Sequence, residues 1–127
     1  MDSKAEKISD AELEVLKILW THNESMTERQ IIDALHGGSG WHRATIQTLI
    51  RRLCEKGVVQ KEKKGVFYFS AAVTKREYAQ ERTADLLNRV YGGNAKNLVS
   101  AMLNDNILSE QGIDDLRSYW RERRNEK

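Results

Sequence analysis

Apolar residues recur at helical spacing near the start of the chain. Leu16 and Trp20 lie on one stripe of the segment 10–22, and a spacing of three to four residues places side chains on one face of an α-helix. Ser9 and Glu12 match the capping-box pattern, in which two side chains satisfy the backbone donors at a helix start. The pattern predicts a first helix over residues 10–22.

A second capping box begins at Thr27, with Gln30 three positions later. Ile31 and Leu35 supply the apolar face of a short helix after it. Glycine adopts the positive φ of a helix end, so we expect this helix to stop at Gly37-Gly38 and residues 37–40 to form a linker.

The segment 41–57 alternates between apolar and polar positions with helical period. Ile46, Leu49, Ile50 and Leu53 cluster on one side, and Gly57 is the expected stop. The opposite side carries small, amide, hydroxyl and charged side chains. These are Ala44, Gln47, Thr48, Arg51, Arg52 and Glu55.

The period then changes from helix to strand. Val58-Val59 and the run Val66–Phe69 are β-branched or aromatic, and a charged turn ending in Lys63-Lys64-Gly65 separates them. Such a pattern predicts a β-hairpin with a basic tip. Three helices followed by a basic hairpin is the order of a winged helix-turn-helix, in which the third helix enters the major groove and the hairpin lies along the backbone.

From Thr74 onward the chain is helical again, with ends predicted at Tyr91-Gly92-Gly93 and starts at Asn94 and Ser109. The apolar stripes of these helices exceed what a small winged domain can cover, so we expect them to pair with a second copy; folding back onto the winged domain is the alternative. The predicted dimerisation residues are Leu86, Val90, Leu98, Val99, Met102, Leu103, Ile113, Leu116 and Trp120.

The predicted fold class is therefore mainly α with a small β-hairpin wing. Residues 1–73 form a winged-helix DNA-binding domain, and residues 74–127 form a helical dimerisation region. Charge supports this division, because residues 41–64 hold seven Lys and Arg against two Asp and Glu in a chain of net charge +2. A local basic stretch indicates a polyanion partner such as DNA, although a solvated helix face is the alternative.

Several short motifs, in order, resemble the penicillinase-repressor family, the winged-helix repressors of β-lactamase and methicillin-resistance operons. The resemblance covers about residues 8–120. Its anchors are Ile8–Glu12, Trp20, Trp41, Thr45–Leu49, Arg52-Leu53, Lys56-Gly57, Tyr91–Gly93, Leu98-Val99 and Leu108-Ser109.

This resemblance implies a homodimeric repressor on an inverted-repeat operator, with DNA contacts from Thr45, Thr48 and Arg52. It also implies release through a membrane sensor protease that cuts the first C-terminal dimerisation helix, where this chain has Ala101-Met102. His42-Arg43-Ala44 and Gln47 depart from the residues typical of the resistance repressors, so the operator sequence need not be theirs. The copper-responsive relatives carry a C-terminal cysteine cluster that this chain lacks.

We divide the basic and polar candidates into two classes. The hairpin lysines are expected on phosphates, while Gln47, Thr48 and Arg51 are candidates for base edges. The full predicted DNA-binding set is Arg43, Ala44, Thr45, Gln47, Thr48, Arg51, Arg52, Lys61, Lys63 and Lys64.

Other chemistry finds little support in the residues. No catalytic motif, cofactor loop or metal-ligand ladder occurs, so we expect neither an enzyme nor a cofactor. Cys54 is expected to be a small core residue, and Arg121, Arg123 and Arg124 to form a frayed basic end. With no long apolar run and no secretory pattern in residues 1–8, a cytoplasmic protein without membrane insertion is expected. A winged-helix docking module that does not bind DNA is the alternative function.

Overall fold

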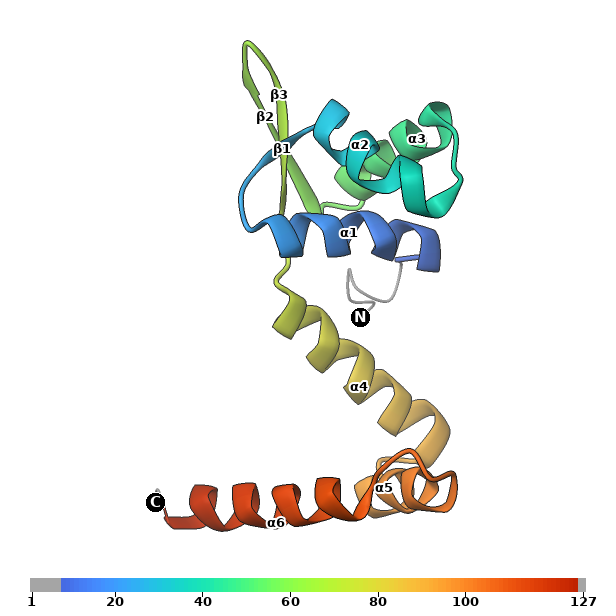
Figure 1. The fold of residues 1–127 in the computed structure, drawn as a ribbon, viewed down its shortest axis with the longest axis vertical. Helices are drawn as coiled ribbons and strands as arrows, with labels where there is room; N and C mark the ends of the chain where they lie inside the picture. Colours follow the sequence, from blue (N-terminus) through green and yellow to red (C-terminus); the bar gives the residue numbers. More distant parts are fainter. Residues whose placement is uncertain (1–7, 126–127) are drawn as a thin grey trace. The chain divides into compact units, whose positions relative to one another are not determined.

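The computed structural model describes residues 8–125, which fold into six helices and a three-stranded sheet (Figure 1). The elements are α1 (Asp10–His22), β1 (Met26–Thr27), α2 (Glu28–Ser39), α3 (Arg43–Glu55), β2 (Val59–Lys64), β3 (Val66–Ala71), α4 (Lys75–Tyr91), α5 (Ala95–Asn104) and α6 (Glu110–Asn125). The chain divides into two compact units, Met1–Thr83 and Ala84–Lys127. The predicted functional boundary at 73/74 lies in the loop before α4 and stays a prediction.

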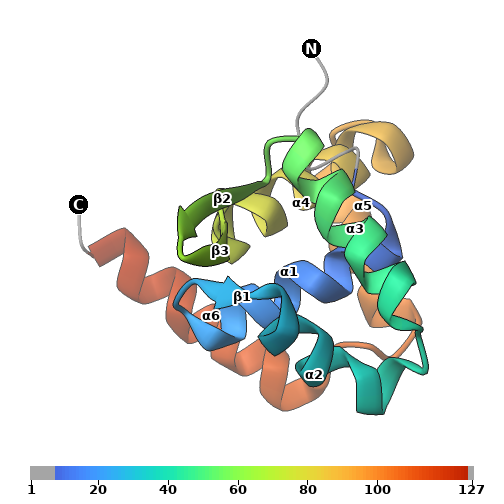
Figure 2. The same cartoon turned by 90° about the horizontal axis from the view of Figure 1, so that it is seen from above.

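The first unit has one hydrophobic core, built where α1, α2 and α3 meet the sheet (Figure 2). Leu16, Ile31, Ile46 and Leu53 are fully buried in it. They come from the apolar stripes of three helices, so helical spacing correctly identified the faces that pack. Trp20 and Trp41 are partly buried and pack against this core.

Both predicted capping boxes are present. The Ser9 hydroxyl accepts from the Glu12 backbone N–H, and the Glu12 carboxylate accepts from the Ser9 N–H. Thr27 and Gln30 make the same reciprocal pair at the start of α2. These bonds satisfy donors that a helix start otherwise leaves unpaired.

The predicted end of α2 is wrong. The helix continues through Gly37 and Gly38 to Ser39, and the residue that takes the left-handed conformation is Gly40, with φ 72°. Glycine permits a helix end without forcing one, so the chain uses the last glycine of the group. The expected linker over residues 37–40 is mostly helical.

The hairpin forms as predicted, with Gly65 at positive φ between Lys64 and Val66. Sequence analysis missed β1, which pairs antiparallel with β3 and gives the strand order β1-β3-β2. Only Met26 and Thr27 take part, opposite Phe69 and Tyr68. Two residues are too few to show the alternating pattern of a strand, and β1 forms only because it pairs with β3.

The second unit consists of the end of α4 together with α5 and α6. Among the described residues, none of these three helices buries a side chain. Of the predicted dimerisation residues, Leu86, Val90, Val99, Leu103, Leu116 and Trp120 are exposed, and Leu98, Met102 and Ile113 are half-buried. The expected frayed end is instead helical, because α6 includes Arg121–Asn125. The last two residues lie outside the described part of the chain.

Candidate nucleic-acid interface

Helix α3 has one buried face and one polar face. Ile46, Leu49, Ile50 and Leu53 are buried, which fixes the rotation of the helix about its own axis. The opposite face follows from that rotation. On it Arg43, Ala44, Thr45, Arg51 and Arg52 are exposed, and Gln47 and Thr48 are half-buried.

The register of the hairpin divides its three lysines between two faces. Lys61 lies opposite Phe69, and Lys63 lies opposite Phe67. Directly opposed residues share a face of a sheet, and the ammonium groups of Lys61 and Lys63 lie 4.7 Å and 5.8 Å from the centre of the Phe67 ring. Lys64 alternates to the other face, where its Nζ is 4.0 Å from a carboxylate oxygen of Glu62.

A hollow with a volume of about 800 Å³ lies between α3 and the hairpin, which we call the α3–wing groove. It brings together five of the ten predicted DNA-binding residues. The groove is lined by Glu28, Ala44, Gln47, Thr48, Ile50, Arg51, Cys54, Glu55, Lys61, Phe67 and Phe69.

The other five predicted residues do not line the α3–wing groove. Arg43 lines a neighbouring hollow that also includes Glu28 and Phe67. Thr45 and Arg52 lie on the exposed surface of α3 beyond the groove, and Lys63 and Lys64 lie at the end of the hairpin. Half of the predicted set thus lines the groove, and the other half lies outside its lining.

The three candidates for base recognition already have partners within the chain. Gln47 donates from Nε2 to the Glu28 carboxylate at 3.2 Å, and the Thr48 hydroxyl donates to the Ala44 carbonyl at 3.0 Å. Arg51 pairs with Glu55 at 3.2 Å, with both side chains more than 60% exposed. An ion pair this exposed contributes little, so Arg51 can exchange it for a nucleic-acid partner at small cost.

An ion pair between a half-buried lysine and a buried carboxylate joins α1 to the end of α3. The Lys56 ammonium donates to both carboxylate oxygens of Glu12, at 2.5 Å and 2.8 Å, and the Glu12 side chain is only 2% exposed. Burial by itself raises the pKa of Glu12. The hydrogen bonds from Lys56 and Ser9 and the charge of Lys56 outweigh it, so the net pKa is lowered. This contact, which sequence reasoning missed, fixes the C-terminal end of α3.

Cys54 is half-buried at the edge of α3, and burial raises the pKa of its thiol. A raised pKa keeps the thiol protonated and unreactive, which agrees with a packing role. The positive charge of Lys61 acts against this shift. His22, His36 and His42 are exposed, and residues 8–125 contain no group of three side chains arranged to hold a metal ion.

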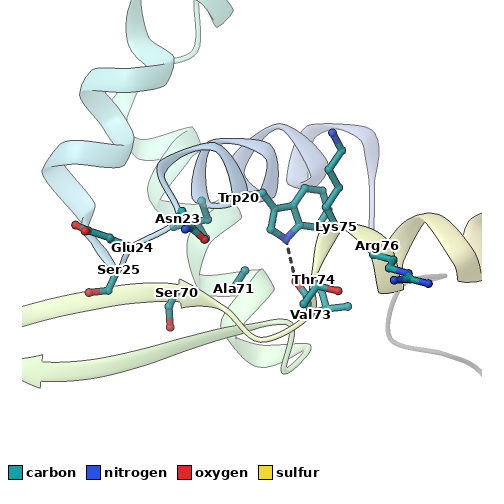
Figure 3. Close-up of a pocket in the computed structure, with 11 residues that line it drawn as sticks. Trp20, Asn23, Glu24, Ser25, Ser70, Ala71, Val73, Thr74, Lys75 and Arg76 are labelled. Carbon is teal, nitrogen blue, oxygen red and sulfur yellow. Dashed lines mark hydrogen bonds between the residues drawn. The ribbon is translucent and has the colours of Figure 1, made fainter.

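A third hollow lies at the base of the hairpin, between the end of α1 and the start of α4 (Figure 3). The Trp20 indole N–H donates to the Val73 carbonyl at 2.8 Å across one side of it. The Trp20 ring also lies 5.7 Å from the Tyr78 ring, centre to centre. These contacts attach the first turns of α4 to the core of the first unit.

Three helices, a twisted hairpin and a polar α3 surface beside basic side chains define a winged helix-turn-helix protein. Residues 8–125 contain no helix long and apolar enough to cross a membrane. The fold class predicted from sequence is confirmed, and the class of protein follows from it.

Comparison with known proteins identifies the family. The profile described as "Penicillinase repressor" matches residues 8–122. The chain is 35% identical to the penicillinase repressor of Bacillus licheniformis over 125 residues, covering 98% of this chain and 97% of that one. It is 31% identical to the methicillin resistance regulatory protein MecI of Staphylococcus aureus strain N315, covering 93% and 96%. The chain belongs to the penicillinase repressor family.

Two solved structures match more than half of the chain. The solution structure of the DNA binding domain of the repressor BlaI aligns with a TM-score of 0.54 and 38% identity, covering 61% of this chain and 94% of that one. Monomeric Bacillus licheniformis BlaI in complex with the blaP half-operator aligns with a TM-score of 0.51 and 38% identity, covering 57% and 88%. These matches confirm the resemblance seen in the sequence, and they favour a repressor over both an enzyme and a docking module.

Proposed function

We propose that this protein is a sequence-specific DNA-binding repressor that acts as a homodimer on an inverted-repeat operator. The observation that carries the proposal is the α3–wing groove, where a polar helix face and basic hairpin residues adjoin. A major groove admits one α-helix. Helix α3 presents its polar face for that purpose, because its four buried residues, Ile46, Leu49, Ile50 and Leu53, pack into the core.

The side chains around the groove divide into two roles. Gln47, Thr48 and Arg51 reach base edges, since amide, hydroxyl and guanidinium groups match the donors and acceptors displayed in the major groove. The remaining basic residues bind phosphates and set affinity without reading sequence. These are Arg43, Arg52, Lys61, Lys63 and Lys64. Thr45 and Ala44 complete the surface that faces the duplex.

The homodimer forms through the second unit. Val90, Leu116 and Trp120 are each more than half exposed, and large apolar side chains grouped on helices mark an interaction surface. A two-fold pair covers the same stripes on both copies at once. Two α3 helices then reach half-sites about 34–36 Å apart on one face of the duplex.

A signal that separates the two copies releases the operator. The family resemblance points to cleavage by a sensor protease at Ala101-Met102, which lies within α5 and is half-buried. A protease binds its substrate in extended form, so cleavage there requires α5 to open first. Separating the two copies lowers the affinity for the operator whether or not this bond is cut.

A titration tests the proposal directly. The full chain is added to a fluorescent duplex from the DNA upstream of its own gene, and to a scrambled duplex of the same length, at several salt concentrations. We expect tighter binding to the upstream duplex and a steep fall in affinity with salt, about 0.9 in log–log slope per phosphate contact. Equal binding to both duplexes at every salt concentration contradicts the proposal.

A further inference from the structure

Glu28 is an acidic residue in the middle of a surface predicted to face DNA. It is the first residue of α2 and lines both the α3–wing groove and the adjoining hollow that contains Arg43. Within residues 8–125 it forms no ion pair; its bond is with the neutral amide of Gln47. A carboxylate beside the phosphate backbone opposes binding, so its place here needs another explanation.

We propose that Glu28 is a specificity-determining residue, which positions the amide of Gln47 for reading a base. The inference rests on the proposed function, because it assumes that α3 enters the major groove. Glu28 acts through Gln47 and is a positioning residue.

The chemistry of the bond supports one orientation of the amide. An ionised carboxylate only accepts hydrogen bonds, so it attracts the amide nitrogen and repels the amide oxygen. Donation from Gln47 Nε2 to Glu28 Oε2 therefore holds the oxygen away from α2. One N–H and the oxygen of Gln47 stay available, and this donor–acceptor pair is the one that binds adenine in the major groove.

The placement of the two residues also favours this role. Both side chains are half-buried, so the bond is partly shielded from water and the long side chains are restricted. Gln47 belongs to a helix whose rotation is fixed by its buried face, and Glu28 belongs to a helix start fixed by the Thr27–Gln30 capping box. Two rigid elements thus hold donor and acceptor in register.

Two substitutions separate the charge of Glu28 from its hydrogen bond. Glu28→Gln removes the charge but keeps an oxygen that accepts from Gln47. Glu28→Ala removes both. Asp33→Ala is the matched control, because it removes the same charge from an exposed position of the same helix. Circular dichroism melts verify that each full-length variant folds.

Each variant is incubated with a pool of short duplexes randomised in sequence, and the bound fraction is sequenced. With Glu28→Ala, we expect the preference at one position of each half-site to fall roughly tenfold, or about 1.4 kcal/mol. Gln47→Ala should lose preference at the same position, and the double variant should lose no more than either. Glu28→Gln should keep the preference while binding every duplex more tightly, and Asp33→Ala should keep the wild-type profile.

Two outcomes overturn the inference. If Glu28→Ala retains the wild-type preference at every position, Glu28 does not position Gln47. If it loses preference at a position different from that of Gln47→Ala, Glu28 contacts a base itself. Failure of the proposed function gives a different result, because the wild-type protein then enriches no sequence from the pool.

Discussion

At the scale of single residues, Glu12 and Lys56 join a buried carboxylate to a cation from a distant part of the chain. Glu12 is 1% exposed and receives the Lys56 ammonium on both oxygens. Removing one partner of a buried pair leaves the other charge without compensation. Loss of Lys56 therefore destabilises the junction between α1 and the end of α3 much more than loss of one partner from an exposed pair.

We predict that Lys56→Met lowers the free energy of unfolding by about 3 kcal/mol, measured by urea denaturation. Lys17→Met is the matched control, since the exposed Lys17–Glu14 pair has a similar length of 3.0 Å and should contribute less than about 1 kcal/mol. Comparable losses in the two variants would show that burial of Glu12 does not govern the strength of its pair.

The same contact predicts a dependence of stability on pH. Because the folded pKa of Glu12 lies below its ordinary value of 4.5, its stabilisation is complete above that pH and is lost as the pH falls through the folded pKa. The unfolding free energy of the wild-type protein should decrease below about pH 4.5. Glu12→Gln, which cannot ionise, should show a shallower decrease in the same series, and an unchanged slope would contradict the assignment.

The Glu12–Lys56 and Gln47–Glu28 contacts could each be predicted only in part from the sequence. Sequence analysis identified Glu12 through its capping box and Gln47 through its place on α3. The partners Lys56 and Glu28 lie 44 and 19 positions away along the chain. No local pattern connects such positions, because the contact exists only after the helices pack.

At the scale of elements, the end of α2 gives a test of the corrected boundary. Gly38 lies inside the helix with free space around it, while Gly40 has φ +72°. We predict that Gly38→Ala stabilises the protein by about 0.5–1 kcal/mol, because alanine loses less entropy in a helix. Gly40→Ala should destabilise it by a similar amount, about 1 kcal/mol, because its backbone conformation is left-handed. Thermal and urea denaturation measure the change in stability of both variants. If Gly38→Ala destabilised the protein and Gly40→Ala stabilised it, the helix would end at Gly37-Gly38, as the sequence predicted.

The hairpin gives a second prediction, which depends on its register. Lys63 shares a face with Phe67, whereas Lys64 lies on the other face beside Glu62. We expect Lys63→Ala to reduce the salt slope of operator binding by about 0.9, the value for one phosphate contact. Lys64→Ala should reduce it less, because the Glu62 carboxylate on the same face weakens the phosphate contact of Lys64. Equal reductions, measured by anisotropy titration, would mean that Glu62 does not weaken that contact.

Apolar spacing was sufficient to predict every helix and the hairpin, because each has a periodic pattern of its own. It failed for β1, whose two residues become a strand only by pairing with Tyr68 and Phe69. It also misplaced the end of α2, where four residues, Gly37–Gly40, include three glycines. The glycines identify a region where the helix can end. The residue at which it does end, Gly40, is known only from its left-handed backbone conformation.

At the scale of the whole molecule, the second unit raises the question of what covers its apolar side chains. The sequence predicted the stripes, and exposed Val90, Leu116 and Trp120 agree with that prediction. Their partner is a second copy in our proposal, since a two-fold operator requires a two-fold protein. A single chain cannot reveal the pairing, because the residues that would complete each contact belong to the other copy.

We predict that Leu116→Glu converts the protein to a monomer, as measured by sedimentation equilibrium. Leu116 is 51% exposed on α6, so a charge there costs little within one chain but is strongly unfavourable in an apolar interface. Ser118→Glu is the matched control, because it places the same charge about 200° away around the same exposed helix. It should remain dimeric.

The DNA affinity of Leu116→Glu decides whether dimerisation matters for repression. When two DNA-binding domains are joined in a dimer, the second binds its half-site intramolecularly, which multiplies the affinity for the operator by about 10²–10⁴. The monomeric variant should therefore lose on the order of a hundredfold or more on the complete inverted repeat. Its affinity for an isolated half-site should equal that of the wild-type protein, because the α3–wing groove is unchanged. A monomeric variant that retained full affinity for the inverted repeat would mean that one copy supplies all the binding energy.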